Sequence, residues 1–63
     1  MKKLRALIVD DEKLNRDILE ILISNHCPEV EVIAKSNSAD DARLKIASNN
    51  IDVLFLDIAM PNE

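Results

Sequence analysis

The sequence predicts an α/β fold, in which strands and helices alternate along the chain and the strands pair in parallel. Two observations predict this class. Short apolar runs alternate with stretches of helical spacing, in the order strand, helix, strand, helix, strand. The sequence contains no glycine, so it lacks the Gly-rich turns that join antiparallel hairpins. Such alternation is typical of parallel strands joined by right-handed crossover helices.

The first strand is expected at residues 4–9, where Arg5 alone interrupts a short apolar run. Runs of this kind suit a strand that is covered on both faces of the sheet. The run ends abruptly in two carboxylates, Asp10 and Asp11, which we therefore place at the carboxyl end of the strand.

A helix is expected over residues 12–26, because apolar side chains recur there at helical spacing. Asp11 is expected to cap its first turn, and Pro28 prevents its continuation. The stripe predicted to face the sheet consists of Leu14, Ile18, Ile21 and Leu22, widened by Leu19 and Ile23.

The second strand is expected at residues 29–36, where Glu and Val alternate in the first half. This alternation predicts a half-exposed strand near an edge of the sheet. Ser38 is expected to cap a second helix over residues 39–48. The residues predicted to face inward from this helix are Ala39, Ala42 and Ile46, with Leu44 or Ala47 as further candidates.

The third strand is expected at residues 52–57. Its uninterrupted apolar run, Val53 to Leu56, predicts a central strand covered on both faces. The run ends in Asp57, so this strand also has a carboxylate at its carboxyl end.

Composition and charge limit the possible classes of protein. The 63 residues suffice for one small domain at most, and a net charge of −4 disfavours binding to nucleic acid. No apolar run has the length of a membrane span, so we expect no membrane segment. The single cysteine cannot form an internal disulfide, which fits a reducing, cytoplasmic location.

The acidic residues at the strand ends predict a cation site. In an open parallel sheet, ligands bind beyond the carboxyl ends of the strands. If the first and third strands are neighbours, Asp10, Asp11 and Asp57 converge at one edge. Like charges held this close need a compensating proton or cation, and Mg²⁺ suits a few hard carboxylate ligands together with water.

Two motifs resemble the N-terminal signatures of response-regulator receiver domains, which are CheY-like modules. They are Val9-Asp10-Asp11-Glu12 after one apolar strand and Leu56-Asp57-Ile58-Ala59-Met60-Pro61 after another. The resemblance covers essentially all 63 residues, but only about the first half of a typical receiver. It implies a partial receiver domain over residues 1–63, with the βαβαβ half of a flavodoxin-like doubly wound sheet, strand order 2-1-3, truncated after the third strand. The Phe before Leu-Asp leans toward receivers attached to LytTR-type DNA-binding domains.

The resemblance also implies a function and residue roles. Asp57 would accept a phosphoryl group from a sensor histidine kinase or a phosphotransfer protein, so the chain would be a signalling module and not an enzyme. Asp11 would bind Mg²⁺ directly and Asp10 mainly through a water molecule, while Asp57 and the backbone carbonyl of Ala59 would complete the set.

The length implies two further expectations. Receivers continue with strands that supply a hydroxyl residue and a lysine to the phosphoryl group, so we expect weak or no phosphate acceptance and impaired signalling here. Without a fourth strand, the Val53 to Leu56 run would be a bare apolar edge. We therefore expect a homo-oligomer that pairs through the edge of the third strand.

Other functions remain open from the sequence. The chain could be a non-catalytic half-domain that pairs with itself or with a complementary half. It could also be an enzyme of the haloacid-dehalogenase type, although that family usually has a second Asp where Ala59 stands here. Asp11 could serve only as a helix cap, and Asp57 only as an acid that ends a strand.

Overall fold

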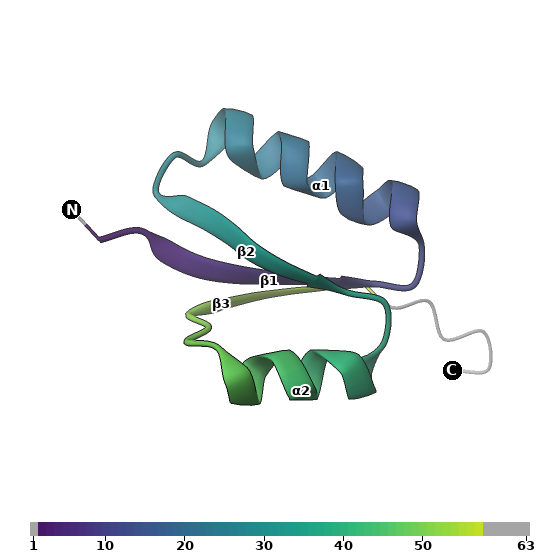
Figure 1. Cartoon of the computed structure of the whole chain (residues 1–63). Helices are drawn as coiled ribbons and strands as arrows, with labels where there is room; N and C mark the ends of the chain where they lie inside the picture. The colour runs from purple at the N-terminus through teal and green to yellow at the C-terminus, as the bar shows by residue number, and fades with distance from the viewer. Residues whose placement is uncertain (1, 58–63) are drawn as a thin grey trace.

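A parallel three-stranded sheet lies between two helices, with α1 on one face and α2 on the other (Figure 1). The computed structural model describes residues 2–57. The elements are β1 (Leu4–Asp10), α1 (Lys13–His26), β2 (Val30–Ser36), α2 (Ala39–Ser48) and β3 (Val53–Asp57). The strand order is β2-β1-β3 and both pairings are parallel, so the predicted α/β class and strand order 2-1-3 are confirmed.

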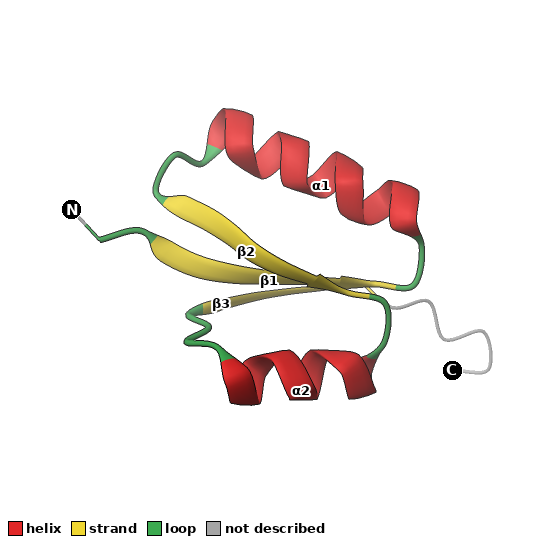
Figure 2. Cartoon of the chain, viewed as in Figure 1, coloured by secondary structure: helices red, strands yellow, loops and turns green. Residues whose placement is uncertain are grey.

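The central strand β1 supplies most of the buried core. Ala6, Leu7, Ile8 and Val9 are all fully inaccessible to solvent, at 0% exposure, because helices cover β1 on both sides (Figure 2). Burying one Leu, Ile or Val side chain stabilises a fold by about 1.5–3 kcal/mol. The prediction that this apolar run is covered on both faces is therefore confirmed.

The predicted inward stripe of α1 is wrong. Its members are exposed, Leu14 by 69% and Ile21 by 58%, whereas Ile23 is the buried residue of this helix. The helix is apolar around much of its circumference, so its periodicity alone does not decide which side packs on the sheet. The side that packs carries Ile23 and half-buried Leu19, the two residues expected only to widen the stripe. The exposed residues of the predicted stripe are Leu14, Ile18, Ile21 and Leu22.

Helix α2 begins as predicted and packs less of its surface than predicted. The Ser38 side chain accepts a hydrogen bond from the backbone N–H of Asp41, at 3.1 Å, which confirms the cap. Ala42 is buried, but Ala39 and Ile46 are exposed, in contrast to the prediction. The small Ala42 side chain brings α2 close to Leu7 and Val9 of β1. Neither helix in the stretch from residue 2 to residue 57 is long and apolar enough to cross a membrane.

Both outer strands of the sheet are partly exposed. For β2 this agrees with the predicted half-exposed edge strand. For β3 the predicted double coverage is wrong, because Leu54 and Leu56 are 46% and 61% exposed. Within the described range, β3 pairs with β1 alone, so its other long side is an edge.

The pairing of β1 with β2 contains one irregularity. Ala6 is paired with Val32, but the next residue of β1, Leu7, is paired with Ala34. Ile33 is therefore an extra residue in β2, which is the pattern of a β-bulge. Beyond the bulge, Ile8 is paired with Lys35 and Val9 with Ser36.

A candidate acidic site at the carboxyl ends of the strands

The backbone brings two predicted acidic positions together. Asp10 is the last residue of β1, Asp57 is the last residue of β3, and the two are partners in the parallel register. Neighbouring strands lie about 4.8 Å apart, so these two positions are adjacent at the carboxyl edge of the sheet. The side chain of Asp57 and all of residues 58–63, including the predicted carbonyl ligand Ala59, lie outside the described part of the chain.

Asp10 is a buried carboxylate of this edge. The residue is only 4% exposed, and its Oδ1 accepts a hydrogen bond from the backbone N–H of Glu12 at 2.9 Å. This contact forms an Asx-type turn that fixes the orientation of the carboxylate. An ionised carboxylate can accept about four hydrogen bonds, so Asp10 keeps capacity for a cation or a bound water.

Asp11 is exposed and does not cap α1, which corrects the prediction. The residue at the cap position is Glu12, and its side chain makes no capping hydrogen bond. The first helical hydrogen bond runs from the Arg16 N–H to the Glu12 carbonyl, so Glu12 occupies the cap position. Asp11 stands one residue before it, inside the turn that Asp10 closes. Asp11 is therefore not engaged as a cap.

Arg16 is a contact of this site that is absent from the predicted site residues. Its Nη1 donates a hydrogen bond to the backbone carbonyl of Asp10 at 2.7 Å, in a partly buried position. Arg16 does not belong to the stripe predicted to face the sheet, which consists of Leu14, Ile18, Ile21 and Leu22. One sequence signal could have indicated this contact: Arg16 lies near the start of a helix that directly follows the acidic residues.

The donors at this edge fit a hard cation such as Mg²⁺. Asp10 is held in place and Asp11 is free of a cap role, and both offer carboxylate oxygens, which this ion prefers over nitrogen or sulfur. Apart from the undescribed Asp57 side chain, residues 2–57 contain no group of three or more His, Cys, Asp or Glu side chains arranged to hold a metal. The predicted set of Asp10, Asp11, Asp57 and Ala59 stays a prediction, because two of its members lie outside the described atoms.

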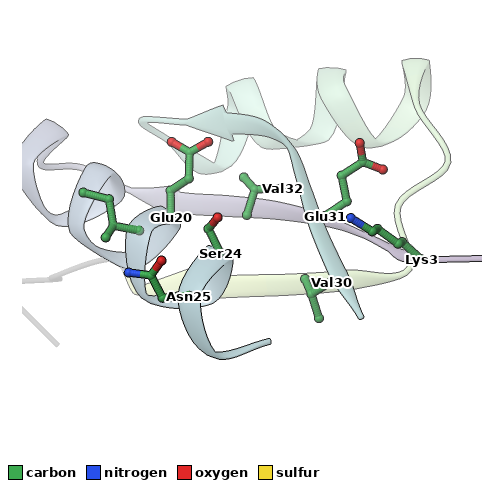
Figure 3. A pocket seen from close by; sticks show the side chains of 8 residues that line it. Lys3, Glu20, Ser24, Asn25, Val30, Glu31 and Val32 are labelled. Carbon is green, nitrogen blue, oxygen red and sulfur yellow. The ribbon is translucent and has the colours of Figure 1, made fainter. Parts of the chain in front are cut away.

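A separate cavity of about 460 Å³ lies between α1 and the beginning of β2 (Figure 3). Its lining combines charged, polar and apolar side chains, among them Glu20 and Ser24 from α1 and Val30 and Val32 from β2. The carboxylate of Glu20 is bound to Lys35 at 2.7 Å. None of the predicted acidic site residues lines this cavity, which lies toward the opposite end of β2 from Ser36.

Three comparisons with known proteins bear on the family. The sequence pattern of the response regulator receiver domain matches residues 6–63. The chain is 41% identical over 61 residues to a protein-glutamate methylesterase/protein-glutamine glutaminase of Hydrogenovibrio crunogenus, covering 97% of this chain and 16% of that protein. It is 38% identical over 60 residues to the sensory transduction protein LytT of Bacillus anthracis, covering 95% of this chain and 24% of that protein. No solved structure matches the chain.

These matches agree with the fold and with the motifs at its carboxyl edge. Methylesterases and LytT proteins both occur among the relatives, so attachment to a LytTR-type domain stays a prediction. The chain spans only 16% to 24% of the length of these curated relatives, so the similarity concerns one segment of each. The family pattern, by contrast, covers nearly the whole chain. The chain therefore belongs to the response regulator receiver domain family.

Proposed function

We propose that this chain is the phosphoacceptor segment of a receiver in a two-component system, and that Asp57 is the residue phosphorylated. The observation that supports this proposal is the register pairing of Asp10 with Asp57 at the carboxyl ends of β1 and β3. In a chain of the receiver family, this pairing puts the proposed phosphoacceptor beside a buried, hydrogen-bonded carboxylate.

The proposed reaction is a transfer of one phosphoryl group. A carboxylate oxygen of Asp57 attacks phosphorus on a phosphohistidine of a sensor histidine kinase or phosphotransfer protein. The bond from phosphorus to the histidine nitrogen breaks, the electron pair stays on that nitrogen, and an acyl phosphate forms on Asp57. Phosphoryl transfer of this kind requires mostly positioning and charge stabilisation, so the protein needs few additional groups.

The chain's own acids would hold Mg²⁺, which supplies positive charge to offset the phosphoryl oxygens. In this proposal Asp11 binds the ion directly and Asp10 acts through water, together with Asp57 and the Ala59 carbonyl. The buried turn at Asp10 restricts its carboxylate to one orientation. Exposed Asp11 remains accessible from solvent.

We further propose that this segment is a signalling module of the cytoplasm and is not itself an enzyme. The methylesterase and glutaminase activities named for some relatives belong to proteins of which this chain spans 16% to 17%. The LytT relatives are named as sensory transduction proteins. A module that receives a phosphoryl group from a kinase fits both kinds of relative.

The test is incubation with Mg²⁺ and acetyl phosphate, followed by intact-mass spectrometry. We expect the wild type to gain the mass of one phosphoryl group, slowly and in small yield, and Asp57→Asn to gain none. Asp40→Asn is the matched control, because Asp40 is an exposed carboxylate on α2. A gain that persists in Asp57→Asn, or no gain at any concentration of acetyl phosphate, rejects the proposal.

A second proposed function is self-association through β3. The two outer strands differ in how their edges are protected. On β2, the ammonium of Lys45 donates a hydrogen bond to the backbone carbonyl of Lys35. On β3, Leu54 and Leu56 are exposed apolar residues beside an edge that pairs with nothing else in the described range. Exposed apolar edges favour pairing with another strand, and we propose a second copy of this chain as the partner.

A further inference from the structure

We propose that Arg16 is a positioning residue of the acidic site, which fixes the peptide that joins Asp10 to Asp11. This inference rests on the proposed function, because it concerns how these two residues are presented to the cation. It assigns a role to a residue of α1 that lies outside the acidic motif itself.

The contact that carries the inference is the hydrogen bond from Arg16 Nη1 to the carbonyl oxygen of Asp10, at 2.7 Å. Its short distance is typical of a hydrogen bond from a charged donor. A peptide unit is planar, so an anchored carbonyl also fixes the direction of the N–H on the following residue. Arg16 therefore sets the orientation of the whole peptide plane between Asp10 and Asp11.

A second contact holds the other side of the same turn. The backbone N–H of Glu12 donates to Asp10 Oδ1 at 2.9 Å, so the carbonyl and the carboxylate of Asp10 are both engaged. With the main chain fixed before and after Asp11, only the side-chain torsions of Asp11 remain free. Arg16 and the Glu12 N–H together thus fix the backbone from which the side chains of Asp10 and Asp11 extend.

Charge and position predict opposite effects of removing Arg16. A guanidinium beside the acidic residues repels an incoming cation, so its loss should tighten Mg²⁺ binding if charge alone mattered. If Arg16 instead positions the Asp10–Asp11 peptide, its loss should weaken Mg²⁺ binding. The sign of the change therefore separates the two roles.

The experiment measures Mg²⁺ affinity by titration calorimetry of the whole chain carrying Arg16→Met or Arg16→Lys. We expect Arg16→Met to weaken binding by at least about tenfold, as is usual when the partner of a metal ligand is removed. Arg16→Lys keeps one donor but not the planar fork, and we expect an intermediate loss. Arg43→Met is the matched control, because Arg43 is exposed on α2 and pairs only with exposed Asp40 among the described residues.

A readout without metal separates this inference from the proposed function. Amide hydrogen exchange at Glu12 reports whether the turn at Asp10 is intact. Arg16→Met should raise this exchange rate by about tenfold relative to wild type, while exchange in β1 and in Arg43→Met stays unchanged. If wild type binds no Mg²⁺, the proposed function fails, and the exchange at Glu12 alone decides the role of Arg16.

Two outcomes overturn the inference. One, where wild type binds Mg²⁺, is an Mg²⁺ affinity of Arg16→Met that equals or exceeds that of wild type. The other is unchanged exchange at Glu12 in that variant. If Arg16→Met does not fold, the same two measurements on Arg16→Lys take its place, with the same signs expected.

Discussion

The ammonium nitrogen of Lys35 lies 2.7 Å from Oε1 of Glu20 and thereby ties β2 to α1. A second carboxylate of α1, Asp17, approaches the same ammonium at 3.2 Å and also pairs with Lys13 at 2.7 Å. The hydrogen bonds that Lys35 donates to Glu20, first, and to Asp17, second, raise the pKa of Lys35 above its usual 10.5. The pKa of Asp17 is lowered below its usual 3.8 by the hydrogen bond that Lys13 donates to it and, to a smaller extent, by the one from Lys35.

The ion pairs of Lys35 should make stability depend on pH only at the extremes. A lowered carboxyl pKa stabilises the fold above 3.8, and this contribution is lost as the pH falls through the folded pKa of Asp17. A raised lysine pKa stabilises the fold below 10.5, and this contribution is lost as the pH rises through the folded pKa of Lys35. Urea unfolding measured across pH should show a smaller fall in the free energy of unfolding for Lys35→Met than for wild type, both as the pH falls below 3.8 and as it rises above 10.5. Equal pH profiles for the two proteins would contradict this. Arg43→Met is the control, and its profile should match wild type.

Leu7→Ala should be the most destabilising simple truncation in β1. Leu7 is fully buried against Val9 and Ala42, so the change leaves a cavity in the core. Truncations of this kind cost about 2–5 kcal/mol of unfolding free energy, which for so small a chain can abolish folding. Circular dichroism with urea measures the loss. Leu44→Ala, at an exposed position of α2, should change the free energy of unfolding by less than about 0.5 kcal/mol.

Ser38→Ala should destabilise α2 through loss of its cap. The Ser38 hydroxyl accepts the Asp41 N–H at 3.1 Å, and removing such a cap costs about 0.5–2 kcal/mol. Thermal melting followed by circular dichroism measures the change. Ser24→Ala is the control, because Ser24 is exposed within α1 and Ala is the better helix former. A melting temperature of Ser38→Ala equal to that of wild type would show that the cap does not stabilise the helix.

Leu56→Lys should convert a self-associated form to monomer if copies pair through β3. Leu56 is 61% exposed at the outer strand, and a lysine there opposes strand pairing by charge and hydration. Sedimentation velocity at micromolar concentration measures the change. Leu14→Lys places the same charge on the exposed side of α1 and should leave the assembly intact. A wild type that sediments as a monomer under these conditions rejects pairing through β3.

The order of elements and the central strand could be predicted from the sequence because both depend on local pattern. The Ala6 to Val9 run is apolar at every position, which leaves few alternatives to a strand covered on both faces. The cap at Ser38 was predictable for the same reason, since it involves residues only three apart.

The packed side of α1 and the turn at Asp10 could not be predicted, because both depend on neighbours. Ile18 and Ile23 are equally apolar, and only contact with the sheet decides that Ile23 is buried and Ile18 is not. Asp11 satisfies the composition of a cap, yet the Arg16 N–H donates to the Glu12 carbonyl, so the helix starts one residue later than an Asp11 cap requires. The exposure of Leu54 and Leu56 likewise depends on which strands are present beside β3.

The bulge at Ile33 decides which helix Lys35 serves. Side chains alternate between the faces of a strand, and if Ile33 were paired with Leu7 in a regular ladder, Lys35 would be the partner of Val9, on the face covered by α2. With the bulge, Lys35 is the partner of Ile8 and reaches Asp17 and Glu20 on α1. Deletion of Ile33 would remove the bulge and still leave Ala34, Lys35 and Ser36 opposite Leu7, Ile8 and Val9, so the charged and the buried surfaces of this end of β2 would keep their places.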